Sequence, residues 1–393
     1  MSYDTTSQPV LAASVTDTDP TAAHRAPNLD YVFDDPAHGE PGRDRMLVHG
    51  LWELVLLLAV AGVGYLLYRE DGAAFSGAGL RELLLSAGVL GAVAAASAIS
   101  LRAGAPNLAV GAVAVAAGLY FGRTSDGGLL QPALIVVAIC AAIGVVQGLI
   151  IAGLHVPGWA VSLVVALLLL AWASTRTGVS AQANLYDPTP HAYYWFGAFA
   201  ALSVIASLVG LVPTVRRGFG RFRPVADPAH RRGWIAAIIV LAATLAATIL
   251  SGLGGVLMVS LSATAVPEEG FMLTGLALGA ALVGGTSAYG RRGGIFGTVL
   301  AVALITLIAR YSDVADLKWS ATVLAAAAVA VGLLVTRLIE RLGRPRPARE
   351  SLDEDWVPVA PATETRSWST TSASTTSGGL WASDDAWGTA DRR

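Results

Sequence analysis

The chain has 393 residues, of which 54% are hydrophobic and only 14% are charged, and its formal net charge is −2. An ordinary soluble domain carries about 25% charged residues, so these proportions exclude a water-soluble globule. The single cysteine, Cys140, excludes a disulfide scaffold, and no Gly-X-Y period indicates collagen. A membrane-spanning helix uses about 20 apolar residues, so the composition allows roughly ten spans.

The chain begins with an acidic tail at residues 1–45, rich in Thr, Asp, Pro and Ala, which predicts disorder. An all-α integral membrane body is expected at 46–340, followed by a second disordered tail at 341–393 that starts basic and becomes rich in Ser and Thr. Within the body, apolar stretches predict ten transmembrane helices, at 47–68, 83–101, 105–122, 130–153, 157–175, 193–213, 234–259, 270–286, 294–309 and 318–337. The third stretch is short and opens with Ala105-Pro106-Asn107, which favours a broken helix.

The basic residues predict the orientation of these helices. If the N-terminal tail is cytoplasmic, sixteen Arg or Lys residues fall on the inner side and six on the outer side. An even number of spans then returns the C-terminal tail to the cytoplasm. We therefore expect a multi-pass protein of the plasma (inner) membrane that contacts the lipid bilayer throughout, with both termini cytoplasmic and no nucleic-acid partner.

Sequence motifs for catalysis are absent. The only lysine, Lys318, follows no glycine loop, so a GxxxxGK[ST] nucleotide site is not expected. No His/Cys cluster has metal-ligand spacing, and neither HExxH nor GxSxG occurs. Glu53 is the only carboxylate inside a predicted span, and we interpret it as a group near the interface, at the positive end of a helix dipole, with a proton relay as the alternative. The chain is expected to be neither an enzyme nor the holder of a cofactor.

Several segments carry more signal than a plain apolar span. The connection Arg216–Trp234 contains six arginines and two prolines, and it suits either a topology determinant at anionic lipid or a docking element for a cytoplasmic partner. Paired glycines in Gly284–Thr298, GGTSAYGRRGGIFGT, allow close helix packing around a basic turn. Polar groups stand within the apolar segments APNLAVG (Ala105–Gly111) and QGLIIAGLHVPGWAVSL (Gln147–Leu163), where they either join helices or line a polar path.

In these stretches the chain resembles the permease subunit of binding-protein-dependent ABC importers, in the ribose/simple-sugar and branched-chain amino acid group. Gly284–Thr298 is similar to the family's Gly-Gly-Thr-Ser, Gly-Gly-x-Gly, Gly-Thr run, and SGLGGVLMVSLSATAVPEEG (Ser251–Gly270) is similar to its Ser-Gly-x-x-Ala-Gly helix. APNLAVG stands where the family has Ile-Asp-Leu-Ser-Val-Gly, and Gln147-Gly148 where it has Asn-Gly. The motif positions are Gly284, Gly285, Thr286, Ser287, Gly293, Gly294, Gly297 and Thr298.

The resemblance implies an ATP-driven importer of a sugar or similar small polar solute, working by alternating access. Two cytoplasmic ATPase subunits would bind ATP and magnesium, an extracytoplasmic binding protein would deliver the solute, and a second permease subunit would complete a homo- or heterodimer. The implied coupling loop contains Arg216, Arg217, Arg221, Arg223, Asp227, Pro228, Arg231 and Arg232. Asn107, Gln147 and Trp159 are the path candidates, because a sugar needs hydrogen bonds and an apolar ring face.

Other functions stay open. A secondary, ion-coupled carrier is the main alternative, and within the importer class the solute could be a branched-chain amino acid or a nucleoside. A membrane scaffold that recruits partners through its tryptophan-bearing C-terminal tail is a third class.

Overall fold

The computed structural model describes residues 46–125, 128–176, 186–210, 212, 234–262, 265–288 and 296–343. All of them belong to the first of two compact units of the chain, Met1–Pro347. These residues form α-helices and two short 3-10 helices, and no strand occurs among them. The predicted all-α class is therefore confirmed for this part of the chain.

Ten α-helices lie within the described ranges. They are α2 (Met46–Glu70), α3 (Gly77–Arg102), α4 (Val110–Thr124), α5 (Leu130–Leu154), α6 (Gly158–Ser174), α7 (Ala192–Val209), α9 (Trp234–Ser262), α10 (Glu269–Val283), α11 (Gly297–Val314) and α12 (Ala321–Gly343). The 3-10 helices are η2 (Gly72–Phe75) and η4 (Thr189–His191). Each α-helix overlaps one of the predicted apolar stretches.

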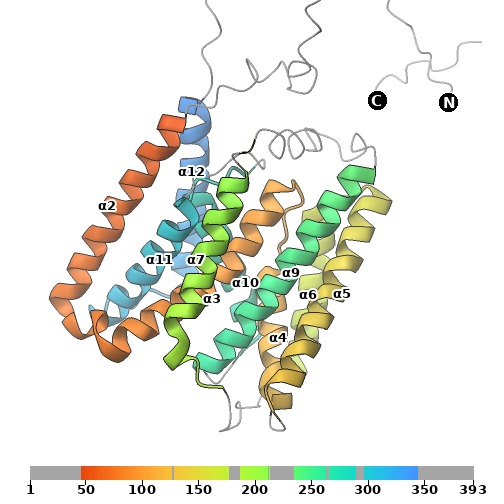
Figure 1. Cartoon of the computed structure of the whole chain (residues 1–393), viewed down its shortest axis with the longest axis horizontal. Helices are drawn as coiled ribbons and strands as arrows, with labels where there is room; N and C mark the ends of the chain where they lie inside the picture. The colour runs from red at the N-terminus through yellow and green to blue at the C-terminus, as the bar shows by residue number, and fades with distance from the viewer. Residues whose placement is uncertain are drawn as a thin grey trace, which may run out of the picture. The chain divides into compact units, whose positions relative to one another are not determined.

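Seven of these helices are long and apolar enough to cross a membrane, whereas α4, α6 and α10 are shorter apolar helices. The structure thus supports a multi-pass membrane protein, and the number of ten spans stays a prediction. Figure 1 shows the first turn of α2 and the last turn of α12 at the same end of the bundle, as an even number of crossings requires. Which side of a membrane that end faces also stays a prediction.

Several predicted boundaries need correction; the second helix, for example, begins at Gly77 rather than at residue 83. The third helix begins at Val110 rather than at residue 105, because the backbone from Gly104 to Asn107 is not helical. The last helix runs on to Gly343, since Arg341 and Leu342 continue its final turns, so the expected C-terminal tail does not start at residue 341. Most of that tail and all of the N-terminal tail lie outside the described residues.

Helices α5 and α9 pack closely against each other through small residues. Cys140, Gly144 and Gly148 form a small-residue stripe on α5 that faces Thr244, Thr248 and Gly252 of α9. A Cβ on Gly148 would lie 2.7 Å from Thr244 Oγ1, so the two backbones approach as closely as they can. Small residues promote such packing where lipid removes the hydrophobic drive between helices. Cys140 is a buried packing residue at this seam, as its apolar surroundings predicted.

Candidate functional site: a polar cluster at a helix break

The chain between α3 and α4 leaves helical geometry inside the apolar body. Gly104 has a φ of +65°, and it ends α3 in a Schellman motif. In that motif Gly104 N donates to Leu101 O at 2.9 Å and Ala105 N donates to Ser100 O at 3.0 Å. Pro106 then favours an extended backbone at the residue before it. This break was anticipated from Ala105-Pro106-Asn107, and it frees backbone groups that need partners, since lipid offers none.

Side chains from four helices and from the break itself supply those partners. We call this group the polar cluster; it consists of Ser100, Asn107, Gln147, Ser162 and Thr274. Ser100 Oγ of α3 accepts from Asn107 N at 3.2 Å, and Ser162 Oγ of α6 accepts from Leu108 N at 2.9 Å. Thr274 Oγ1 of α10 accepts from Gly111 N at 3.1 Å. The break is therefore fixed by hydrogen bonds rather than by side-chain burial alone.

Asn107 and Gln147, two of the three path candidates, are brought together within the cluster. Asn107 Nδ2 donates to Gln147 Oε1 at 3.2 Å, and Asn107 Oδ1 accepts from Ala109 N at 2.9 Å, just before α4 begins. Asn107 is 5% exposed and Gln147 is 0% exposed. Gln147 lies seven residues before the end of α5, about 10 Å along the helix axis, which places the pair well inside the bundle.

The Gln147 amide nitrogen differs from the other amide groups of the cluster. Nε2 is buried and has no hydrogen-bond partner among the described residues. A buried donor without a partner costs about 1–3 kcal/mol, and such groups are rare in native proteins. None of the cluster's hydrogen bonds described above involves a charged side chain, so its polarity comes from amides, hydroxyls and backbone.

Trp159, the third path candidate, does not join the pair through its ring. Its side chain is in the first turn of α6 and the residue is 52% exposed. Only its backbone takes part, because Ser162 Oγ donates to Trp159 O at 3.1 Å. The expected combination of two amides and an aromatic ring on one polar path is therefore not assembled within the described chain.

Helix α10 begins beside the first turn of α4, inside the bundle. After α9 ends, Ala265 packs with Val115 and Leu119 of α4, and the chain then reaches Gly270 against Ala112. A Cβ on Gly270 would lie 3.5 Å from Ala112 Cα. From this meeting point α4 runs about 20 Å to its own end. The described segment before α10, residues 265–268, therefore lies along α4.

The glycine motif Gly284–Thr298 forms a close contact where its residues are described. Gly285, with a φ of +87°, ends α10 in a second Schellman motif, and Thr286 N donates to Ala281 O at 3.0 Å. A Cβ on Gly284 would lie 2.7 Å from Thr298 N, and one on Gly297 would strike the Gly284 carbonyl. Close approach of two helix ends therefore explains these glycines. Ser287 is buried at this turn; Gly293 and Gly294 lie outside the described residues.

Two neighbouring side chains of α2 hold this contact. Trp52 Nε1 donates to Val283 O at 2.7 Å, at the carboxyl end of α10. Glu53 Oε1 accepts from Phe296 N at 2.7 Å and from Gly297 N at 3.2 Å, at the amino end of α11. Glu53 does place a carboxylate at the positive end of a helix, as expected, but that helix is α11 and not α2, to which Glu53 belongs.

The predicted coupling loop cannot be placed, because its residues from Arg216 to Arg232 lie outside the described ranges. No group of three or more His, Cys, Asp or Glu that could hold a metal ion occurs in the part of the chain that the structure describes.

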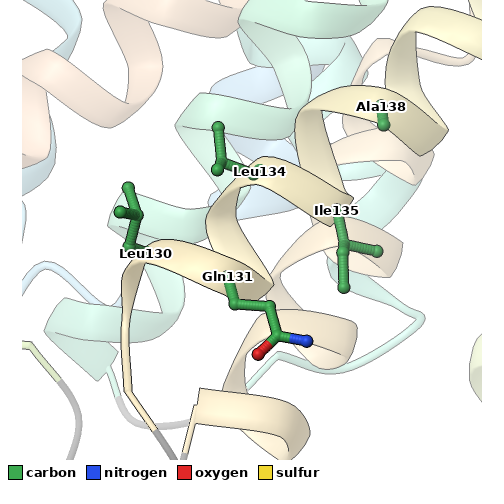
Figure 2. Close-up of a pocket in the computed structure, with 5 residues that line it drawn as sticks. All are labelled: Leu130, Gln131, Leu134, Ile135 and Ala138. Atoms are coloured by element: carbon green, nitrogen blue, oxygen red, sulfur yellow. The ribbon is translucent and has the colours of Figure 1, made fainter.

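A pocket of about 470 Å³ lies on α5 away from the cluster, and Figure 2 shows its lining side chains, Leu130, Gln131, Leu134, Ile135 and Ala138. All five come from the first turns of α5, and the pocket is open and almost wholly apolar. Gln147 lies on the buried stripe of the same helix, nine residues beyond Ala138, or about 13 Å along the axis. The pocket and the path candidates are therefore separate features.

Three cluster members were missed from the sequence: Ser100, Ser162 and Thr274. Each is a single hydroxyl in an apolar helix, a pattern that most often means a local bond to the preceding turn. No protein-family model matches the chain, and no curated protein and no solved structure matches it either. The resemblance to importer permeases therefore stays a prediction.

Proposed function

We propose that the chain is the membrane-spanning subunit of an ATP-driven importer of the plasma membrane, and that it moves a sugar or similar small polar solute. The observation that carries the proposal is the polar cluster at the α3–α4 break. A helix break inside an apolar bundle is tolerated only where its polar groups are bonded within the protein or line a cavity, and transporters use such breaks to hold solutes.

The arrangement of the resembling segments supports the same function. Asn107 comes from Ala105–Gly111, while Gln147 and Ser162 come from Gln147–Leu163. Gly270, the last residue of Ser251–Gly270, lies in the first turn of α10, and its carbonyl oxygen accepts from Thr274 Oγ1 of the cluster at 3.0 Å. Two stretches that were singled out separately thus supply three of the five cluster residues, and the third ends beside the cluster, which is expected if they serve one function.

In this proposal the power comes from partner subunits. ATPase subunits would dock on the cytoplasmic side, at the arginine-rich loop, and a second permease subunit and an external binding protein would complete the assembly. Helix α2 contributes by holding the carboxyl end of α10 and the amino end of α11, through Trp52 and Glu53.

The test measures ATP-dependent solute uptake by the assembled complex. Deletion of residues 224–230 from the arginine-rich loop should abolish copurification with an ATPase subunit and ATP-dependent uptake, while membrane insertion is retained. Deletion of seven residues from the C-terminal tail, 370–376, is the matched control and should leave both unchanged. Uptake driven by an ion gradient in vesicles without ATP would contradict the proposal and favour a secondary carrier.

A further inference from the structure

The polar cluster contains one hydrogen-bonding amide group that the fold leaves unused. Gln147 Oε1 accepts from Asn107 Nδ2, and Asn107 Oδ1 accepts from Ala109 N, so each carbonyl oxygen of this amide pair already accepts one hydrogen bond. Gln147 Nε2, in contrast, has no partner among the described residues although the side chain is fully buried. Within this amide pair, Nε2 is therefore the one polar atom that makes no hydrogen bond to a described residue.

Packing alone does not account for a glutamine at this position. The buried stripe of α5 on which it lies is otherwise small or apolar and includes Val136, Cys140, Gly144 and Ile151. The Gln147 carbonyl oxygen holds Asn107, but the Nε2 donor has no such use, and native proteins rarely leave a buried donor unsatisfied. The retained amide thus indicates a partner that binds in another state of the protein.

The local field favours an oxygen atom as that partner. Asn107, to which Gln147 is bonded, stands at the amino end of α4, where the helix dipole is positive. An amide N–H and a helix amino end both favour a neutral or anionic oxygen acceptor and disfavour an ammonium group. Helix α10 also begins here, but its first residue, Glu269, already supplies a carboxylate to its own amino end.

We propose that Gln147 Nε2 binds an acceptor oxygen of the transported solute, a hydroxyl, carbonyl or carboxylate oxygen, and selects against cationic solutes. This inference rests on the proposed function and adds the solute class to it. Access requires the α3–α4 break to move, and the break is held on this side by the single bond from Asn107 Nδ2 to Gln147 Oε1. Solute binding would therefore replace an unsatisfied donor with a bonded one.

The experiment measures thermal unfolding of the purified full chain without solute and then with three probes of one carbon skeleton: D-glucose, D-gluconate and D-glucosamine. The variants are Gln147→Leu and Gln147→Glu, and the control is Gln131→Leu, at an exposed glutamine of the same helix. Without solute, Gln147→Leu should unfold within ~2 °C of the parent, because it leaves Asn107 Nδ2 unpaired but removes the unpaired amide.

With the probes, the parent and Gln131→Leu should gain stability from glucose or gluconate and none from glucosamine, and both Gln147 variants should lose the gain. A glucose shift identifies hydroxyl oxygens as the ligand, and a gluconate shift identifies the carboxylate. The assignment is overturned by a large loss of stability in solute-free Gln147→Leu, by a shift that this variant retains, by an equal shift with glucosamine, or by no shift with any probe. Copurification of Gln147→Leu with an ATPase subunit is measured in parallel, and its persistence separates failure of this assignment from failure of the importer proposal.

Discussion

The contact between α4 and α9 predicts a large effect for the smallest possible side-chain addition. Gly255 of α9 is buried, and a Cβ built on it would strike the carbonyl oxygen of Ala114 in α4 and lie 2.6 Å from the carbonyl carbon. Ordinary van der Waals contact begins at 3.4 Å, so clearing the carbonyl carbon alone requires the two backbones to separate by about 0.8 Å, and clearing the nearer oxygen requires more. The obstacle is backbone, and no rotamer change relieves it.

Overpacking of this kind costs about 1–3 kcal/mol, and we expect the upper end for Gly255→Ala because neither helix can yield by side-chain rotation. The higher helix propensity of alanine returns at most about 1 kcal/mol, which leaves a net loss of roughly 2 kcal/mol. Gly197→Ala in α7 is the control, since nothing lies within 4 Å of its Cβ. It should be neutral or stabilising by up to about 1 kcal/mol.

Thermal unfolding in detergent, followed by tryptophan fluorescence, measures both variants against the parent. Relative to the parent, Gly255→Ala should unfold at a lower temperature, whereas Gly197→Ala should unfold at the same or a higher temperature. If Gly255→Ala unfolds together with Gly197→Ala, the close approach of α4 to α9 is refuted.

Three further predictions concern the other contacts. Glu53→Ala should lower the free energy of unfolding by about 1 kcal/mol, because α11 loses its cap, and Glu53→Gln should lower it less. Glu70→Ala, at the exposed end of α2, should leave it unchanged. Equal effects of all three variants would contradict the cap. Gly285→Ala should cost about 1–2 kcal/mol in the same assay because its φ is +87°, whereas the unobstructed Gly153→Ala should not destabilise. Cys140 should resist alkylation by a maleimide in the folded protein and react after denaturation, since it is 2% exposed; rapid labelling of the folded chain would show that α5 does not pack on α9 as described.

The glycine motif and the arginine-rich loop show two different limits of prediction. Paired glycines correctly indicated a close approach near Gly284 and Gly297, because only a residue without a side chain permits it. Nothing in the spacing of Trp52 and Glu53 indicated that α2 would hold that turn, since the contact joins residues more than 200 positions apart. A local sequence pattern indicates how closely a segment can pack, but it does not indicate which distant segment packs against it.

The approximate positions of the helices in the described ranges follow from composition and hydropathy, because a backbone in an apolar environment must bond within its own segment. The break before α4 follows as well, since Pro106 and Gly104 restrict the backbone locally. The polar cluster does not follow: Ser100, Ser162 and Thr274 acquire their partners only when α3, α6 and α10 pack around the break. Trp159 failed to join for the same reason, because the direction in which a side chain faces depends on the packing of its helix. The hydropathy of a segment depends only on its own residues and is therefore available from the sequence. Hydrogen bonds between distant side chains depend on how the folded helices pack together.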